Sequence, residues 1–181
     1  MILPFFLYHP DPIGTGCIRL SDSVCGACGQ ARGFTYTGPV YGEIVGGDEA
    51  ICPWCIADGT AHAKLGAEFT DPRGVGGFGD WDAVPTEVVE QIAYRTPAFS
   101  AWQEERWYTH CSDAAEFLGV AGRLELDAFG AEATAAIRRE SGLDAENWES
   151  YYKALDRNLG PSAYVFRCRH CGKYGGYSDF K

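Results

Sequence analysis

Six of the eight cysteines occur in Cys-x-x-Cys pairs, a spacing that lets two thiols bind one metal ion. The first two pairs, Cys25 with Cys28 and Cys52 with Cys55, are separated by 23 residues. Two such pairs can surround one zinc ion with four thiolates in tetrahedral geometry. Since four sulfur ligands leave no position for a water molecule, the sequence predicts one structural zinc ion at Cys25, Cys28, Cys52 and Cys55.

The third pair, Cys168 with Cys171, has no fourth Cys-x-x-Cys pair to complete a site. His110 and Cys111 are the nearest candidates by residue type, although adjacent residues rarely bind one ion together. Two alternatives stay open here. One is a second zinc ion held by His110, Cys111, Cys168 and Cys171, and the other is a β-turn whose free thiols pack as small apolar groups. Cys17 has no partner, and we expect it to be structural.

Other chemistry has weaker support in the sequence. A redox pair at Cys52 and Cys55 would need a thioredoxin-like βαβ unit around it, which the neighbouring residues do not supply. His9 is expected to bond to a backbone carbonyl. The motifs of metalloproteases, serine hydrolases, kinases and phosphate-binding loops are absent from the sequence. The residues therefore do not predict an enzyme.

The elements expected around the first two pairs are those of a treble-clef zinc site. Gly29 follows the first pair and allows the positive φ of a tight knuckle turn. Residues 33–41 are expected to form a strand, a turn and a second strand, and residues 44–49 a loop. A short helix is expected after Cys52, with Pro53 in its first turn. Residues 1–24 are expected to be an extended arm whose aromatic side chains dock on a core.

The rest of the chain is expected to be mainly helical. Apolar periodicity and capping residues indicate helices over residues 85–95, 100–107, 127–140 and 144–155, with a helical turn over residues 113–118. Strands are expected at residues 163–167 and 174–177, on either side of the third pair. We therefore predict an α+β fold in one domain, residues 1–181. Its parts are a zinc-binding lobe of treble-clef or knuckle type with short β-hairpins (about 20–68), a helical part (about 83–158) and a C-terminal knuckle hairpin (about 162–179).

The charge balance limits the possible partners. The formal net charge is −10, and residues 1–91 carry twelve acidic but only four basic side chains. Such a surface repels nucleic acid and anionic membranes and attracts basic partners. Prolines interrupt the apolar run of residues 1–12, which has no basic residue, and no stretch approaches about 18 apolar residues. We therefore expect neither a signal peptide nor a membrane span, and a cytoplasmic location that keeps thiols reduced.

Taken together, the order of these motifs resembles the CbrC-like family of small bacterial proteins associated with tolerance to colicins. The resembling segments run nearly from end to end: residues 8–12, 25–29, 37–39, 52–59, 95–97 with Phe99, 102–103, Trp107 with 110–111 and Asp113, and 168–172 with Asp179. The chain departs from the family at Ala115, where members often carry a further cysteine.

The resemblance implies an immunity or tolerance protein that binds and neutralises a toxin. A basic nuclease is the kind of toxin that we expect. An inhibitor of such a toxin gains from acidic side chains that imitate phosphates. The candidates for this surface are Asp48, Glu49, Asp58, Asp71, Asp80, Asp82, Glu87 and Glu90. Two alternatives stay open: a zinc-containing regulatory or scaffold protein, and a thiol- or histidine-dependent enzyme that uses His9, Cys111 or the pair Cys52 and Cys55.

Overall fold

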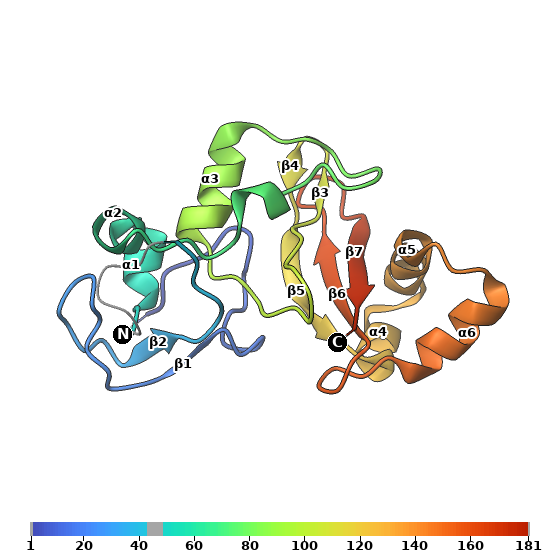
Figure 1. Cartoon of the computed structure of the whole chain (residues 1–181), viewed down its shortest axis with the longest axis horizontal. Helices are drawn as coiled ribbons and strands as arrows, with labels where there is room; N and C mark the ends of the chain where they lie inside the picture. Colours follow the sequence, from blue (N-terminus) through green and yellow to red (C-terminus); the bar gives the residue numbers. More distant parts are fainter. Residues whose placement is uncertain (1, 43–48, 181) are drawn as a thin grey trace. The chain divides into compact units, whose positions relative to one another are not determined.

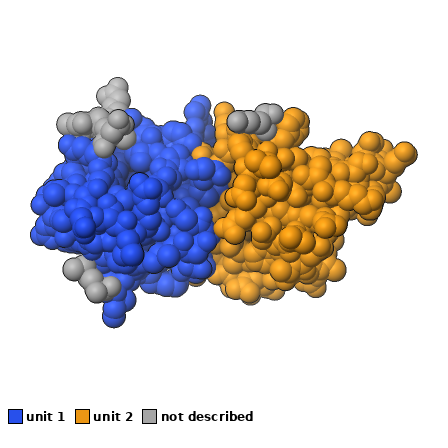
Figure 2. Space-filling model, turned by 90° about the horizontal axis from the view of Figure 1, so that it is seen from below, with its two compact units in different colours: residues 1–75, 84–100 blue, residues 76–83, 101–181 orange. Residues whose placement is uncertain are grey.

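The computed structural model describes residues 2–42 and 49–180, and it divides the chain into two compact units (Figures 1 and 2). Unit 1 comprises residues 1–75 and 84–100, and unit 2 comprises residues 76–83 and 101–181. The expected zinc-binding lobe falls in unit 1, whereas the expected helical part is shared between the units. The prediction of a single domain over residues 1–181 stays a prediction. Within the described residues, no helix has the length and apolar character needed to cross a bilayer.

Unit 1 is built from a two-stranded sheet and short helices. Strand β1 (Ile18–Leu20) pairs antiparallel with β2 (Phe34–Tyr36), and Ile18 lies opposite Tyr36. The helices are α1 (Pro53–Ala57), α2 (Thr60–Leu65), the 3₁₀ helix η1 (Pro72–Gly74) and α3 (Thr86–Arg95). The largest fully buried apolar side chains of this unit come from strand, helix and loop alike: Ile18, Ile56, Phe69, Ile92 and Phe99.

Two local features of unit 1 follow from residue type. Gly59 has a φ of +80°, a conformation that costs glycine little, and it separates α1 from α2. The predicted helix after Cys52 is therefore two short helices, with Pro53 in the first turn as expected. The arm docks as predicted through Phe6 and Tyr8, which are buried, whereas Phe5 and Leu7 are exposed.

The expected strand-turn-strand over residues 33–41 is only half correct. Strand β2 takes its partner from the N-terminal arm, and the N–H of Tyr36 also donates to the carbonyl of Ile51. Beyond Pro39, which has no N–H to give to a ladder, Tyr41 forms an isolated bridge with Glu68. The loop expected at residues 44–49 lies outside the described residues, except for Glu49.

Unit 2 contains a hairpin, a three-stranded sheet and three helices (Figure 1). The hairpin joins β3 (Thr109–His110) to β4 (Asp113–Ala114). The antiparallel sheet has the order β5 (Glu116–Ala121), β6 (Ser162–Arg167) and β7 (Tyr174–Asp179). The helices are α4 (Arg123–Phe129), α5 (Ala131–Ser141) and α6 (Ala145–Ala154), of which α5 packs against β7.

Two apolar groups hold unit 2 together. The first lies between the helices and the sheet: Ala121, Leu126, Ala133, Ile137, Trp148, Leu155, Ala163 and Val165. In the second, the fully buried Trp107 packs against Phe117 and Phe166 and donates its indole N–H to the carbonyl of Ala115 at 2.9 Å. Both groups pack on the three-stranded sheet, the first through Ala163 and Val165 and the second through Phe117 and Phe166.

Several predictions for unit 2 are confirmed. The strands flanking the third cysteine pair are β6 and β7, and Asp144 caps α6 by accepting the N–H of Asn147 at 2.9 Å. The observed mixture of helices and antiparallel strands confirms the predicted α+β class.

Three helix predictions in unit 2 are wrong. Residues 100–107 form an irregular segment with a bend at residues 102–103, because the N–H groups of Trp102 and Arg106 donate to the hydroxyls of Tyr164 and Tyr177 on the sheet. Residues 113–118 are strand rather than helical turn, with alternating burial along β5. Residues 127–140 belong to two helices, because Gly130, with a φ of +97°, ends α4 and begins α5.

Candidate metal centres

The first centre brings together Cys25, Cys28, Cys52 and Cys55 in unit 1. Their sulfur atoms all lie within 4.8 Å of one another. The Sγ atoms of Cys28 and Cys52 are 3.9 Å apart. Two sulfurs bound to one tetrahedral zinc at about 2.3 Å would be about 3.8 Å apart, so this spacing suits a zinc ion.

Local backbone geometry explains how the four thiols meet. Cys25 and Cys28 lie in a turn closed by the N–H of Gly29, which donates to the carbonyl of Cys25 at 2.7 Å. Gly29 has a φ of +68°, as the knuckle requires. Cys52 is the N-cap of α1, and its N–H donates to the sulfur of Cys25 at 3.3 Å. Cys55 follows in the first turn of α1, so both residues of this pair face the knuckle.

The environment of these thiols favours a bound cation. Burial raises the pKa of Cys52 to about 11, and burial raises that of Cys55 further. For Cys25, burial works in the same direction, but the N–H groups of Cys52, Cys28 and Ala27 outweigh it and lower the pKa. A buried thiolate is unfavourable unless a cation lies beside it. Zinc supplies that cation, and its binding releases the thiol protons. The donor set therefore fits the predicted structural zinc.

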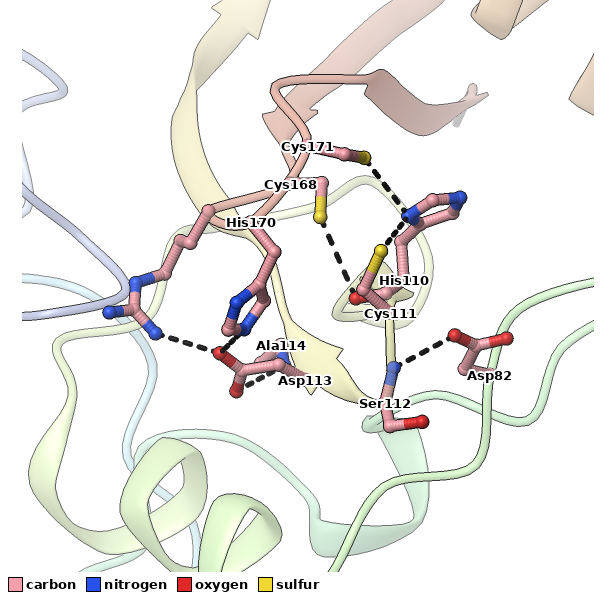
Figure 3. Close-up of polar contacts among 10 residues, drawn as sticks. Asp82, His110, Cys111, Ser112, Asp113, Ala114, Cys168, His170 and Cys171 are labelled. Atoms are coloured by element: carbon pink, nitrogen blue, oxygen red, sulfur yellow. Dashed lines mark hydrogen bonds and ion pairs between the residues drawn. The ribbon is translucent and has the colours of Figure 1, made fainter.

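The second centre brings together His110, Cys111, Cys168 and Cys171 in unit 2 (Figure 3). The Nδ1 atom of His110 lies 3.2 Å from the sulfur of Cys111 and 3.5 Å from that of Cys171. A nitrogen and a sulfur bound to one tetrahedral zinc would be about 3.6 Å apart. The second alternative for Cys168 and Cys171, a turn with buried free thiols, is met by Cys168 alone, because Cys171 is exposed.

The turn between β3 and β4 explains how adjacent residues face one ion. Cys111 and Ser112 both have a φ of +57°, the left-handed conformation of a two-residue hairpin turn. Asp82 supports this turn by accepting the N–H of Ser112 at 2.9 Å (Figure 3). The turn thus brings the donor atoms of His110 and Cys111 to one place, as the first of the two alternatives for the third pair requires. The turn contains no glycine or asparagine, so the sequence offers no signal for it.

A cluster of charged groups flanks the second centre. Asp113 accepts from Arg169 Nη1 at 2.7 Å, from His170 Nε2 at 2.9 Å and from the N–H of Ala114 at 2.8 Å (Figure 3). His170 thus points to Asp113 rather than to the sulfurs. These contacts tie β4 to the turn that carries Cys168 and Cys171, and sequence reasoning did not single them out.

His9 and Cys17 occupy structural positions in unit 1. His9 is fully buried; its Nδ1 lies 2.6 Å from the carbonyl oxygen of Pro97 and its Nε2 2.7 Å from the hydroxyl of Thr15. Since a carbonyl can only accept, Nδ1 carries the proton and Nε2 accepts from Thr15. The predicted bond from His9 to a carbonyl is present. Burial lowers the pKa of His9 to about 4, and burial raises that of Cys17 to about 11.

The eight acidic candidates for a partner-binding surface have different surroundings. Glu49, Asp58, Glu87 and Glu90 are exposed in unit 1. Asp71 forms an ion pair with Arg73 at 2.7 Å. Asp80 and Asp82 belong to unit 2, and Asp48 lies outside the described residues. Their role in binding a partner stays a prediction.

Comparisons with known proteins give a family but no activity. The profile of the "Uncharacterised protein family (UPF0167)" matches residues 3–180. UPF0167 proteins Mb2317 of Mycobacterium bovis and MT2352 of Mycobacterium tuberculosis are each 47% identical over 184 residues, which covers 98% of this chain and 94% of theirs. UPF0167 protein PA1536 of Pseudomonas aeruginosa is 39% identical over 178 residues, covering 98% of this chain and 97% of its own. No solved structure matches the chain.

Proposed function

We propose that this chain, which belongs to the UPF0167 family of uncharacterised proteins, is a zinc-stabilised binding protein for a basic protein partner. The observation that carries the proposal is the presence of two centres with four Cys or His ligand atoms each. A tetrahedral zinc with four protein ligands has no open position for water, so it stabilises a fold rather than activating a substrate.

The buried position of His9 also supports a binding role. His9 is buried, and both of its ring nitrogens are engaged by Pro97 and Thr15. A general base must reach the proton that it abstracts, and a fully buried ring cannot do so. This geometry favours a packing role for His9 over the histidine-dependent enzyme that the sequence left open.

The proposed partner is basic because the chain carries a net charge of −10. Glu87 and Glu90 lie exposed on α3. Asp58 lies exposed between α1 and α2 and accepts the N–H of Thr60 at 2.8 Å. Acidic groups of this kind speed the encounter with a basic partner. The finer form of the proposal, a cytoplasmic immunity protein that neutralises a basic nuclease toxin, rests on the resemblance to CbrC-like proteins.

The test uses the zinc-loaded full chain and the product of a neighbouring gene that encodes a basic nuclease. We expect a complex whose association rate falls at least tenfold between about 50 and 300 mM salt, since screening weakens the attraction. The double variant Glu87→Lys/Glu90→Lys should slow association to a similar extent. The control Glu132→Lys, at an exposed position on α5, should change it little. Association that ignores both salt and the charge reversal on α3 would refute this proposal.

A regulatory zinc protein is the second candidate, favoured by the exposure of the second centre. Cys111 and Cys171 are exposed, whereas Cys25, Cys52 and Cys55 are buried. Zinc at the second centre is therefore open to exchange with solvent ligands. A chelator competition should remove one zinc ion at least tenfold faster than the other, and equal release rates would remove the support for this candidate.

A further inference from the structure

A pocket in unit 2 lies outside the chemistry assigned so far. Its volume is about 290 Å³, just below the range of about 300–1,000 Å³ typical of small-molecule sites. It is lined by α5, by β7 and the turn before it, and by the segment around Trp81. The side chains that define it are Phe78, Trp81, Tyr108, Arg139, Glu140 and Lys173.

Aromatic rings form one wall of the pocket. Trp81 meets Phe78 edge-on at a centroid distance of 5.6 Å and meets Tyr108 edge-on at 5.3 Å. Tyr108 is packed closely over β7, where a Cβ on Gly175 would lie 2.1 Å from its ring. These rings are held by their neighbours, so they offer a preformed apolar surface at small entropic cost.

One of the three cations in the lining is already neutralised. Arg106 pairs with Glu140 at 3.1 Å, and its guanidinium lies 4.2 Å from the ring centroid of Tyr177. Arg106 also lies over Phe78 and Trp81 at 5.7 and 5.6 Å. Arg106 is therefore a structural part of the pocket, and we do not expect it to pair with a ligand.

Arg139 and Lys173 remain available for a ligand. The described residues place no ion pair on the exposed side chain of Arg139. The Nζ atom of Lys173 lies 3.3 Å from Nε2 of His110. Lys173 thus lies between the pocket and the second centre, and its flexible side chain can turn toward a ligand in the pocket.

We propose that this pocket binds a small aromatic carboxylate, with Arg139 and Lys173 pairing with the carboxylate and Trp81 and Tyr108 contacting the ring. The charges of the lining favour a monoanion. Three cations face two carboxylates, those of Asp80 and Glu140, which leaves one positive charge in a protein whose net charge is −10. The small volume limits the ligand to about one ring.

The test is a titration of the zinc-loaded full chain followed by NMR, with phenylacetate as the probe. We expect saturable binding, and at least tenfold weaker binding of the neutral analogue phenylacetamide and of acetate, which lacks the ring. Phenyl phosphate should also bind more weakly than phenylacetate at pH 8, where it is a dianion. Equal binding of the acid and the amide, or tighter binding of acetate or phenyl phosphate, would overturn the proposal.

Variants on one helix locate the site. Arg139→Gln should weaken phenylacetate binding at least fivefold, whereas Arg138→Gln, at the exposed neighbouring position outside the pocket lining, should not change it. Ala136→Leu should abolish binding by filling the pocket, with circular dichroism and zinc content showing that the fold is retained. If Arg139→Gln and Arg138→Gln bind phenylacetate equally well, the pocket is not the site. The proposal is independent of the toxin partner and can fail or succeed without it.

Discussion

The buried imidazole of His9 makes the stability of the chain depend on pH in a way that can be calculated. Burial lowers the pKa of His9 in the folded chain to about 4, against an ordinary value of 6.5. Between these two values the unfolded chain binds a proton that the folded chain does not. Stability from His9 is therefore fully present above pH 6.5 and is lost as the pH falls through about 4.

The size of the effect follows from the shift. A difference of about 2.5 pKa units corresponds to about 3 kcal/mol when the pH is below both values. Within the practical range, the linkage relation gives a loss of about 2 kcal/mol between pH 7 and pH 5. His9→Gln removes the titrating group and retains both a donor and an acceptor for Pro97 and Thr15.

The assay is urea unfolding of the unchanged chain and of His9→Gln at pH 7, 6 and 5, at a constant level of zinc. Acid also weakens zinc binding, but it does so equally in both proteins, so the difference between them isolates His9. We expect His9→Gln to be the less stable at pH 7 and to lose about 2 kcal/mol less on going to pH 5. If the two proteins lose stability in parallel, within about 0.5 kcal/mol, the assignment of a neutral buried His9 is wrong.

The remaining predictions concern the metal centres and the packing of β7. Cys52→Ser should reduce the zinc content, measured by elemental analysis, from two ions per chain to one. The control Cys17→Ala should leave it at two. An unchanged zinc content in Cys52→Ser would contradict the first centre. Cys171→Ser loaded with cobalt in place of zinc should show only the absorption of a four-sulfur centre, because the centre with a histidine ligand is broken. Loss of both absorptions would show that the two centres are not independent. Gly175→Ala should lower the free energy of unfolding by about 1–3 kcal/mol, since its Cβ would lie 2.1 Å from the ring of Tyr108; a cost near zero would mean that this ring moves freely.

Features of the molecule that depend on a few neighbouring residues were predictable from the sequence. The knuckle at Cys25 needs only two thiols and the positive φ of Gly29, and the start of α6 needs only the side chain of Asp144. Strands β6 and β7 flank a turn of the same kind. In each case the groups that interact lie within one turn of chain, so no distant partner has to be found.

The features that the sequence predicted wrongly or left open depend on groups far apart in the chain. Residues 100–107 have helical spacing, yet the hydroxyls of Tyr164 and Tyr177 take their N–H groups. The second metal centre joins His110 and Cys111 to a pair 57 residues later, and this meeting depends on the pairing of β5 with β6 and on a left-handed turn without glycine.

Cysteine spacing thus specified that metal ions belong in this chain, because a Cys-x-x-Cys turn brings its own two sulfurs together. Which residues complete the second centre was settled by strand pairing and core packing. The free energy that stabilises strand pairing and core packing comes from contacts between residues distant in sequence, so no local spacing of residues predicts it.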